Sequence, residues 1–254
     1  MQTVVFQSQA IVLILFMKFS LALAGLMTLL PASILATLPF GLAGPQGTVL
    51  FLNGFHFVSG PFEDTDYEVS ANHYCVIIRD DMLQCVVYNT ATTPAHLAGV
   101  EYIITEDAFA TLDYEERQLW HSHSYEVTSG FLIEPGLPSP VDHTIMKDVL
   151  VNTYGKTIHT WRYDQKDALY PVGVPELVMG FTHDDQITPD FVLERDDLFG
   201  SNTTEIRKSR QDIVPNDVLP GADSWKYGYA LSFGIVNKTI HTEFSSSSSE
   251  QGPK

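Results

Sequence analysis

Short stretches between residues 48 and 182 are either continuously apolar or, as at 156–164, alternate between apolar and polar residues, and both patterns predict β-strands. Four such stretches lie at 48–60, 99–105, 156–164 and 175–182, the first of them broken at Asn53-Gly54. The segment HYCVIIRDDMLQCVVYN adds two apolar strands on either side of a turn at 79–82. The pattern therefore indicates a sheet built largely from hairpins.

A period of three to four residues predicts helices at three places. The stretches are 106–112, 139–155 and 188–200. Ser139 and Pro140 suit the start of the second helix and Gly155 its end. Hairpins mixed with separate helices predict one α+β domain over 48–213, with an antiparallel or mixed sheet and a few helices.

The N-terminal segment has a different character. It carries a single base, Lys18, before an apolar stretch at 21–30, and small residues follow. This three-part pattern predicts a secretory signal peptide over 1–36, with Met17 as an alternative start. The alternative interpretation is a segment that stays uncleaved and anchors the protein in a membrane.

The predicted destination is therefore the secretory pathway and the outside of the cell. Asn202 and Asn237 each begin an Asn-x-Thr tripeptide, the acceptor pattern for glycosylation, which agrees with that route. Residues 37–47 are expected to be an exposed lead-in, and 214–254 an extension that ends in a flexible serine-rich tail.

Charge narrows the range of partners. The chain has 254 residues, with 31 acidic against 14 basic side chains and a net charge of −17. Such an excess repels phosphate backbones, so nucleic-acid binding is excluded, and it also repels anionic lipid headgroups. A lipid or another small apolar ligand fits this charge better, and a membrane is a partner only if the N-terminal segment stays uncleaved. Nothing in the sequence predicts the oligomeric state.

Two cysteines lie in the predicted hairpin, Cys75 and Cys85. A two-residue loop at Asp80-Asp81 would place Cys75 opposite Val86, so a direct cross-strand bond requires a slipped or odd-length turn. An oxidising compartment favours the bond nevertheless. The disulfide and the two free thiols are equally supported.

The segment WHSHSYE, residues 120–126, holds the strongest candidate chemistry. On a strand, His121 and His123 point to the same side together with Tyr125. Glu126 then points to the opposite side, unless a bulge near Ser124 turns it round.

Other residues can complete a metal site with His121 and His123. His73 and Glu101 are the first candidates, and His56, His159, Glu126 and Tyr125 are further ones. Imidazole and carboxylate ligands suit zinc, iron or manganese. The competing interpretation, narrowly favoured, is that these side chains pack in a core or cleft and donate to backbone carbonyls.

Nine motifs follow one another in the order typical of a known family. They are NGFHF, ANHYCVI, LQCVVYN, GVEYIITE, LWHSHSYEVTSGFL, PG-x-P, YGKTIHTW, GVPELVMGFT and RKSRQDI. Over residues 48–213 the chain resembles the DUF1264 family, whose plant members are called oil body-associated proteins. These members associate with seed lipid droplets, and no catalytic residue or cofactor is established for them.

The resemblance implies a lipid-related, binding or structural protein of unknown biochemical activity. The alternative is a metal-dependent enzyme with its site at His121 and His123. The predicted signal peptide and the glycosylation sites depart from the plant pattern, and they favour a secreted or luminal member.

Overall fold

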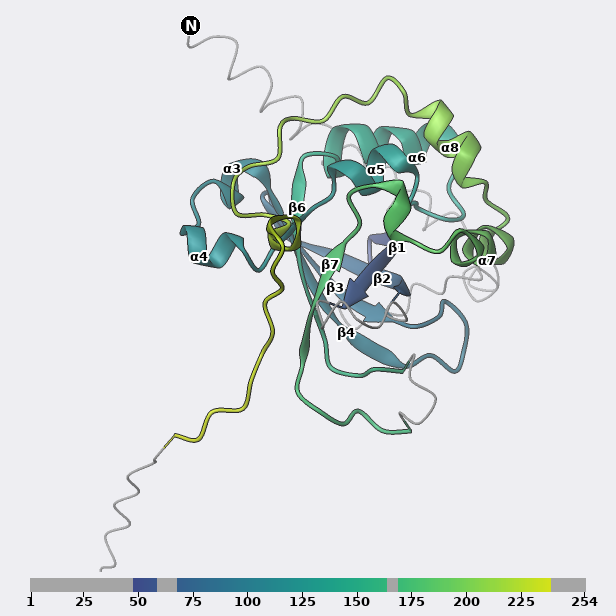
Figure 1. The fold of residues 1–254 in the computed structure, drawn as a ribbon. Helices are drawn as coiled ribbons and strands as arrows, with labels where there is room; N and C mark the ends of the chain where they lie inside the picture. Colours follow the sequence, from purple (N-terminus) through teal and green to yellow (C-terminus); the bar gives the residue numbers. More distant parts are fainter. Residues whose placement is uncertain (1–47, 59–67, 164–168, 239–254) are drawn as a thin grey trace, which may run out of the picture.

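The computed structural model describes residues 48–58, 68–163 and 169–238. Within this part, seven strands form one antiparallel sheet in the order β4-β3-β2-β1-β7-β6-β5 (Figure 1). The strands are β1 (Leu50–Val58), β2 (Glu68–Arg79), β3 (Met82–Tyr88), β4 (Leu97–Thr105), β5 (His121–Ser122), β6 (Thr153–His159) and β7 (Glu176–Gly180). Because β4 also pairs with β6, six of the strands close into a barrel, to which β5 is added.

Helices cover the barrel on several sides. They are α3 (Glu106–Phe109), α4 (Tyr114–Arg117), α5 (Ser124–Ser129), α6 (Ser139–Ile145), the π-helical η1 (Met146–Leu150), the short η2 (Asp184–Gln186), α7 (Pro189–Phe199), α8 (Thr203–Ser209) and η3 (Ser224–Tyr227). Figure 1 shows α5, α6 and α8 gathered over one end of the barrel, opposite the long β6–β7 connection. None of the helices in the described ranges is long and apolar enough to cross a membrane. The predicted α+β class, with an antiparallel sheet in one domain, is confirmed.

The β2–β3 hairpin explains how the two cysteines meet. Arg79 pairs with Met82, so the expected two-residue loop at Asp80-Asp81 is present. One residue further on the register shifts, because Ile78 is an extra residue in β2 and forms a bulge. The shift places Cys75 opposite Cys85, and the two sulfurs form a disulfide with a bond length of 2.01 Å.

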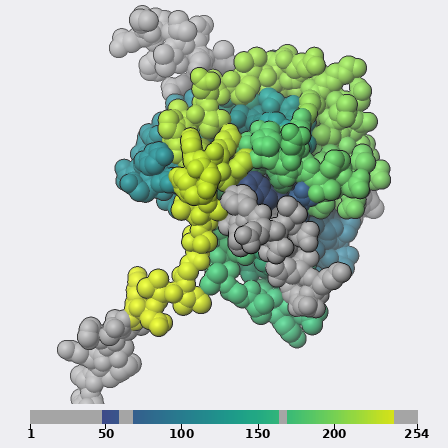
Figure 2. All heavy atoms as spheres, in the orientation of Figure 1, coloured from purple at the N-terminus to yellow at the C-terminus, as the bar shows by residue number. Residues whose placement is uncertain are grey.

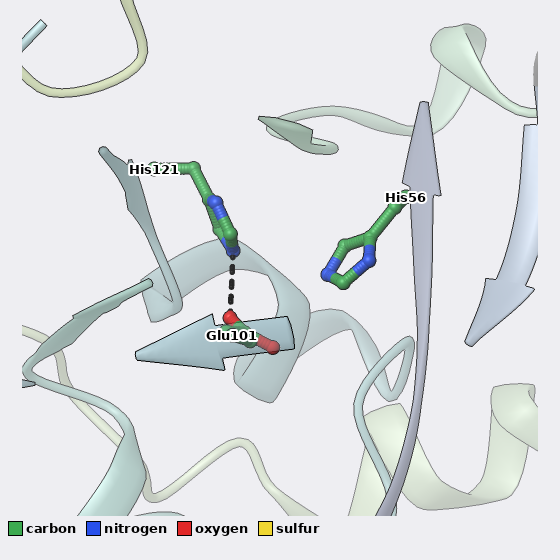
Figure 3. A group of neighbouring side chains, drawn as sticks. All are labelled: His56, Glu101 and His121. Carbon is green, nitrogen blue, oxygen red and sulfur yellow. Dashed lines mark ion pairs between the residues drawn. The ribbon is translucent and has the colours of Figure 1, made fainter. Parts of the chain in front are cut away.

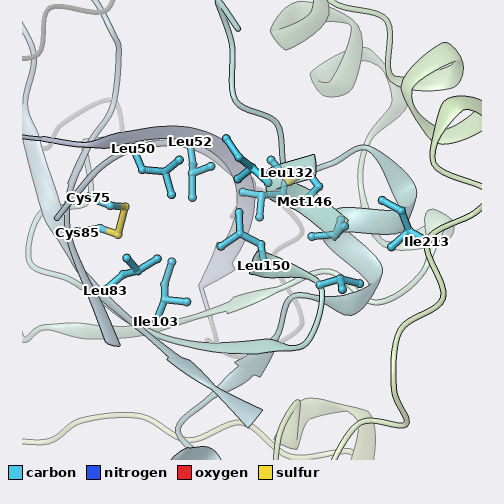
Figure 4. Close-up of a cluster of buried hydrophobic side chains, with 13 residues drawn as sticks. Leu50, Leu52, Cys75, Leu83, Cys85, Ile103, Leu132, Met146, Leu150 and Ile213 are labelled. Atoms are coloured by element: carbon cyan, nitrogen blue, oxygen red, sulfur yellow. A yellow bond between two sulfur atoms is a disulfide. The ribbon is translucent and has the colours of Figure 1, made fainter. Parts of the chain in front are cut away.

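One half of the barrel interior is apolar (Figure 4). Leu50, Leu52, Leu83, Ile103 and the disulfide point inward from β1 to β4. The side chains of Leu132, Met146 and Leu150 pack against them and fill that end of the barrel. Burial of these side chains is the main apolar contribution to the stability of this half.

Two element predictions were wrong. The helix expected over 139–155 ends at Leu150, because residues 153–159 pair with β4 as the strand β6. The stretch expected to break at Asn53-Gly54 is one continuous strand. A side chain at position 54 would approach Leu132 Cδ1 to 3.1 Å, so glycine here serves close packing rather than a turn.

Part of the C-terminal segment packs against the barrel. Asn216 N donates a hydrogen bond to Asn152 Oδ1, Leu219 N donates to the Tyr154 hydroxyl, and Asp223 is fully buried. The Asp223 carboxylate accepts hydrogen bonds from the backbone N and the Oγ of Ser122, each at 2.8 Å. The segment therefore holds β5 in place. The predicted signal peptide, the lead-in up to residue 47 and the serine-rich end lie outside the described residues.

Candidate metal centre

The other half of the barrel interior is polar. His56, His73, Glu101 and His159 occupy inward positions of β1, β2, β4 and β6, and His121 reaches the same space from β5. Strand side chains alternate, and the three on β1, β2 and β4 lie an even number of residues from an inward side chain of the apolar half: His56 from Leu52, His73 from Cys75 and Glu101 from Ile103. All five side chains are at most 2% exposed.

Glu101 lies at the centre of this cluster. Its Oε2 is 2.7 Å from His73 Nε2, and its Oε1 is 3.4 Å from His121 Nε2 and 3.3 Å from His123 Nε2. The ring centroid of His56 is 5.1 Å from that of His73 and 5.4 Å from that of His121. Figure 3 shows the rings of His56 and His121 turned toward the space beside the Glu101 carboxylate.

Several donor and acceptor atoms of the cluster are left without an aligned hydrogen bond. Among the described residues, this holds for both ring nitrogens of His73 and His121, for Nδ1 of His56 and for both carboxyl oxygens of Glu126. The contact of His73 with Glu101 is short enough for a hydrogen bond, but its geometry is poorly directed, so we treat it as an electrostatic contact. Buried polar atoms in native proteins are normally satisfied, so this group requires an explanation.

Two glycines make the room that the cluster occupies. A Cβ at Gly155 of β6 would lie 2.7 Å from His121 Nε2 and closer still to Glu101 Oε1. A Cβ at Gly180 of β7 would lie 2.8 Å from Glu126 Oε2 and 3.0 Å from His121 Cδ2. Real Cβ atoms do not approach other atoms so closely, so both positions require glycine while the cluster keeps this arrangement.

The environment sets the protonation of the cluster. Burial tends to raise the pKa of Glu101, but the imidazoles of His73, His121 and His123 outweigh it and hold that pKa well below its usual range. Burial lowers the pKa of His56 and of His123, although Glu101 opposes the shift. An ionised carboxylate beside neutral imidazoles is the state in which these groups bind a metal.

Glu126 behaves in the opposite way. Burial, together with the charges of Glu101 and Asp223, raises the pKa of Glu126 well above its usual value. Its Oε2 lies 3.9 Å from His121 Nε2. The pKa values of Glu101 and Glu126 are therefore shifted in opposite directions, although both carboxyl groups are buried near the same imidazole.

Two sets of three residues bring their ligand atoms within 4.8 Å of one another: His56, Glu101 and His121, and His121, His123 and Glu126. The first set offers two imidazoles and one carboxylate from three strands, a combination that suits zinc, iron or manganese. Nδ1 of His123 donates to Thr153 Oγ1 at 2.8 Å, because that hydroxyl itself donates to Leu150 O. This leaves Nε2 of His123, which faces Glu101, with the lone pair that a metal ligand needs. His73 belongs to neither set and contacts Glu101 instead, and His159 lies further out, 6.2 Å from the His56 ring.

The local structure of WHSHSYE differs from the predicted strand. β5 ends at Ser122, His123 is the N-cap of α5, and the helix turns Glu126 inward without a bulge. Tyr125 points away from the cluster, and its hydroxyl donates to Asp184. The expectation that Tyr125 shares a face with His121 was therefore wrong.

Fold and site together define an antiparallel β-barrel protein with a buried histidine–glutamate cluster. The family model described as "Protein of unknown function (DUF1264)" matches residues 45–214. The chain belongs to the DUF1264 family, as the sequence motifs predicted.

Its relatives include plant proteins of similar sequence. Oil body-associated protein 1B of Arabidopsis thaliana is 38% identical over 159 residues, which are 63% of this chain and 64% of that protein. Oil body-associated protein 2A of Zea mays is 37% identical over 188 residues, which are 71% of this chain and 74% of that protein. The chain thus spans less than two thirds of the first of these relatives. No solved structure matches.

These relatives overturn the predicted destination. Their names link them to oil bodies, which are lipid droplets of the cytosol, so the assignment to the secretory pathway was wrong. Asn202 also has a structural role that needs no glycan, because its side chain accepts a hydrogen bond from Glu205 N at 3.0 Å and caps α8.

Proposed function

We propose that this protein binds a transition-metal ion inside its barrel, through His56, Glu101 and His121, and uses it as a metal-dependent enzyme. The observation that carries the proposal is the cluster of buried nitrogen and oxygen atoms without aligned hydrogen bonds, gathered around one carboxylate. A metal ion at this set would satisfy one ring nitrogen of His56 and one of His121 together. Three protein ligands leave coordination positions open, as is usual at catalytic metal sites.

The surrounding residues support this assignment. His73 contacts the Glu101 oxygen that lies away from His121, and it would orient the carboxylate as outer-shell partners of metal ligands do. Gly155 and Gly180 leave the volume into which these side chains extend. A bound zinc, iron or manganese ion would supply Lewis-acid or redox chemistry at this place.

Metal content tests the proposal directly. The full chain is loaded separately with zinc, iron and manganese, freed of excess metal without chelators, and assayed by elemental mass spectrometry. We expect near-stoichiometric metal in the wild type and its loss in Glu101→Gln and in His56→Gln. His96→Gln is the matched control, because this exposed imidazole stacks on Trp161 outside the cluster.

Circular dichroism shows whether each variant is folded. Absence of all three metals from the wild type contradicts the proposal. Unchanged metal in a folded Glu101→Gln variant contradicts the ligand set.

We propose as a second function that the protein associates with lipid droplets. The names of its relatives, oil body-associated proteins, favour this function. The net charge of −17 disfavours anionic headgroups, so contact would depend on apolar side chains. Flotation of the purified chain with artificial droplets of triacylglycerol, coated with phosphatidylcholine, tests it. Protein that stays in the aqueous fraction contradicts this function.

A further inference from the structure

The β6–β7 connection carries an uncovered apolar turn at residues 169–174. Its sequence, LYPVGV, contains no charged residue. The side chains of Leu169, Tyr170 and Val172 are 78%, 72% and 69% exposed, and Val174 is also exposed. Single exposed apolar residues are ordinary on protein surfaces, but consecutive ones of this size indicate a binding surface.

The turn has a defined shape. Val172 N donates a hydrogen bond to Tyr170 O at 2.8 Å, and Gly173 has a positive φ of 93° that permits the bend. A Cβ added at Gly173 would meet nothing within 4 Å in the described part of the chain. The backbone here therefore stands clear of the barrel.

The position of the turn leaves it free to meet a large surface. Figure 1 shows the β6–β7 connection at the opposite end of the molecule from α5, α6 and α8. In Figure 2 the coloured atoms of this connection form a lobe at the lower edge of the barrel. An extended interface could approach this lobe without meeting the helices.

We propose that the 169–174 turn inserts into the surface of a lipid droplet, a monolayer of zwitterionic phospholipid over neutral oil. This inference rests on the second proposed function and names the surface that performs it. Leucine and valine suit the acyl layer, and a tyrosine suits the boundary, because its ring is apolar and its hydroxyl polar. Since the acidic chain repels anionic headgroups, insertion of apolar side chains provides the attraction.

A second exposed apolar pair offers a matched control. Leu193 and Leu198 of α7 are 59% and 60% exposed, but charged residues, ERDD, separate them. The test variant is Leu169→Asp/Val172→Asp, which removes two exposed apolar side chains from the turn and adds two negative charges. The control variant, Leu193→Asp/Leu198→Asp, makes the same change in α7.

The test is flotation of the full-length proteins with droplets of triacylglycerol coated with phosphatidylcholine. We expect the wild type and the α7 variant to float, and the turn variant to bind at least about tenfold more weakly. If the wild type and both variants float equally, the turn is not the docking surface, although droplet association stands. If both variants lose binding equally, added charge explains the loss and the inference is overturned. If the wild type does not float, droplet association itself fails.

Tyr170→Trp gives an independent reading of the same contact. Its additional fluorescence is expected to shift to shorter wavelength when droplets are added, because the ring leaves water. An unchanged spectrum from a variant that floats contradicts insertion of the turn.

Discussion

The replacement of Gly155 by alanine tests the packing of the cluster and its proposed chemistry together. Gly155 lies in β6 beneath Glu101 and His121, and the added Cβ would lie 2.7 Å from His121 Nε2 and closer to Glu101 Oε1. Both side chains are buried, so neither can move into solvent. The Glu101 carboxylate is the more flexible of the two, and we expect it to be displaced from its position beside His121.

The effect on stability is the difference of two opposing terms. Alanine in a strand restricts the unfolded chain more than glycine does, which stabilises the fold by about 0.5–1 kcal/mol. Overpacking of the interior costs about 1–3 kcal/mol. With the middle of each range, the net loss is about 1 kcal/mol, which for a domain of this size lowers the melting temperature by roughly 2–4 °C.

The effect on metal binding is larger, because displaced Glu101 no longer completes the set with His56 and His121. We expect metal affinity to fall by about 10–100-fold or more. Isothermal titration calorimetry with zinc measures the metal affinity, and thermal unfolding of the metal-free protein measures the stability.

Two other glycines calibrate the result. Gly234 is exposed and a Cβ there meets nothing within 4 Å among the described atoms, so Gly234→Ala should change neither quantity. Gly54→Ala should lower stability less than Gly155→Ala does, because the added Cβ would lie 3.1 Å from Leu132 Cδ1, which can shift slightly. Wild-type metal affinity in a destabilised Gly155→Ala variant would refute Glu101 as a ligand. A Gly155→Ala variant as stable as the wild type would refute the close packing of Glu101 and His121 against Gly155.

Three further predictions concern stability. Burial and the nearby Asp142 raise the pKa of Glu134 to about 8 in the folded state, against about 4.5 in the unfolded chain. Between these two pH values the folded state keeps a proton that the unfolded state has lost, so the free energy of unfolding of the wild type falls as the pH rises. Urea unfolding at pH 5 and at pH 8 measures this effect. The free energy of unfolding of Glu134→Gln, relative to that of the wild type, should rise by on the order of 3 kcal/mol from pH 5 to pH 8; the same difference at both pH values would contradict the pKa shift. Arg195→Leu should cost about 3–5 kcal/mol in the same assay, because the buried guanidinium pairs with Asp196 and also donates to backbone carbonyls; a loss below 1 kcal/mol would be inconsistent with that role. Reduction of the Cys75–Cys85 disulfide by dithiothreitol should lower the free energy of unfolding by about 3 kcal/mol, seen as a lower melting temperature. In the Cys75→Ala/Cys85→Ala control, dithiothreitol should leave the melting temperature unchanged.

The elements with local signals could be predicted from the sequence. The two-residue loop at Asp80-Asp81 and the helix between Pro189 and Gly200 depend on turn and cap residues that are neighbours in the chain. The closure of the barrel depends instead on pairing between β4 and β6, where Glu101 lies opposite Thr157. Alternating residues show that such strands exist but do not show which strand each one pairs with.

The candidate site divides in the same way. Histidines and glutamates in the predicted strands were identified as candidates, because their chemistry is visible in the sequence. Which of these side chains meet depends on the closure of the barrel and on the short helix α5, which points Tyr125 away from the cluster and Glu126 toward it. Gly155 was interpreted as the end of a helix, although it lies in β6, and Gly180 was missed, although an isolated glycine within a strand pattern signals close approach of another group.

The energetic cost of the cluster argues against a purely packing role. An unsatisfied buried donor or acceptor costs about 1–3 kcal/mol, and His56 and His121, the two imidazoles of the proposed metal site, hold three such atoms. Their sum is comparable with the roughly 5–15 kcal/mol by which a typical domain is stable. Apolar side chains fill the other half of the same barrel without this cost, so the fold does not require histidines at these positions. Bound zinc in small structural sites contributes about 10–16 kcal/mol, which is enough to offset such a cost. The proposed ion would therefore offset a cost that packing alone leaves uncompensated, and thermal unfolding with and without added metal would measure the difference.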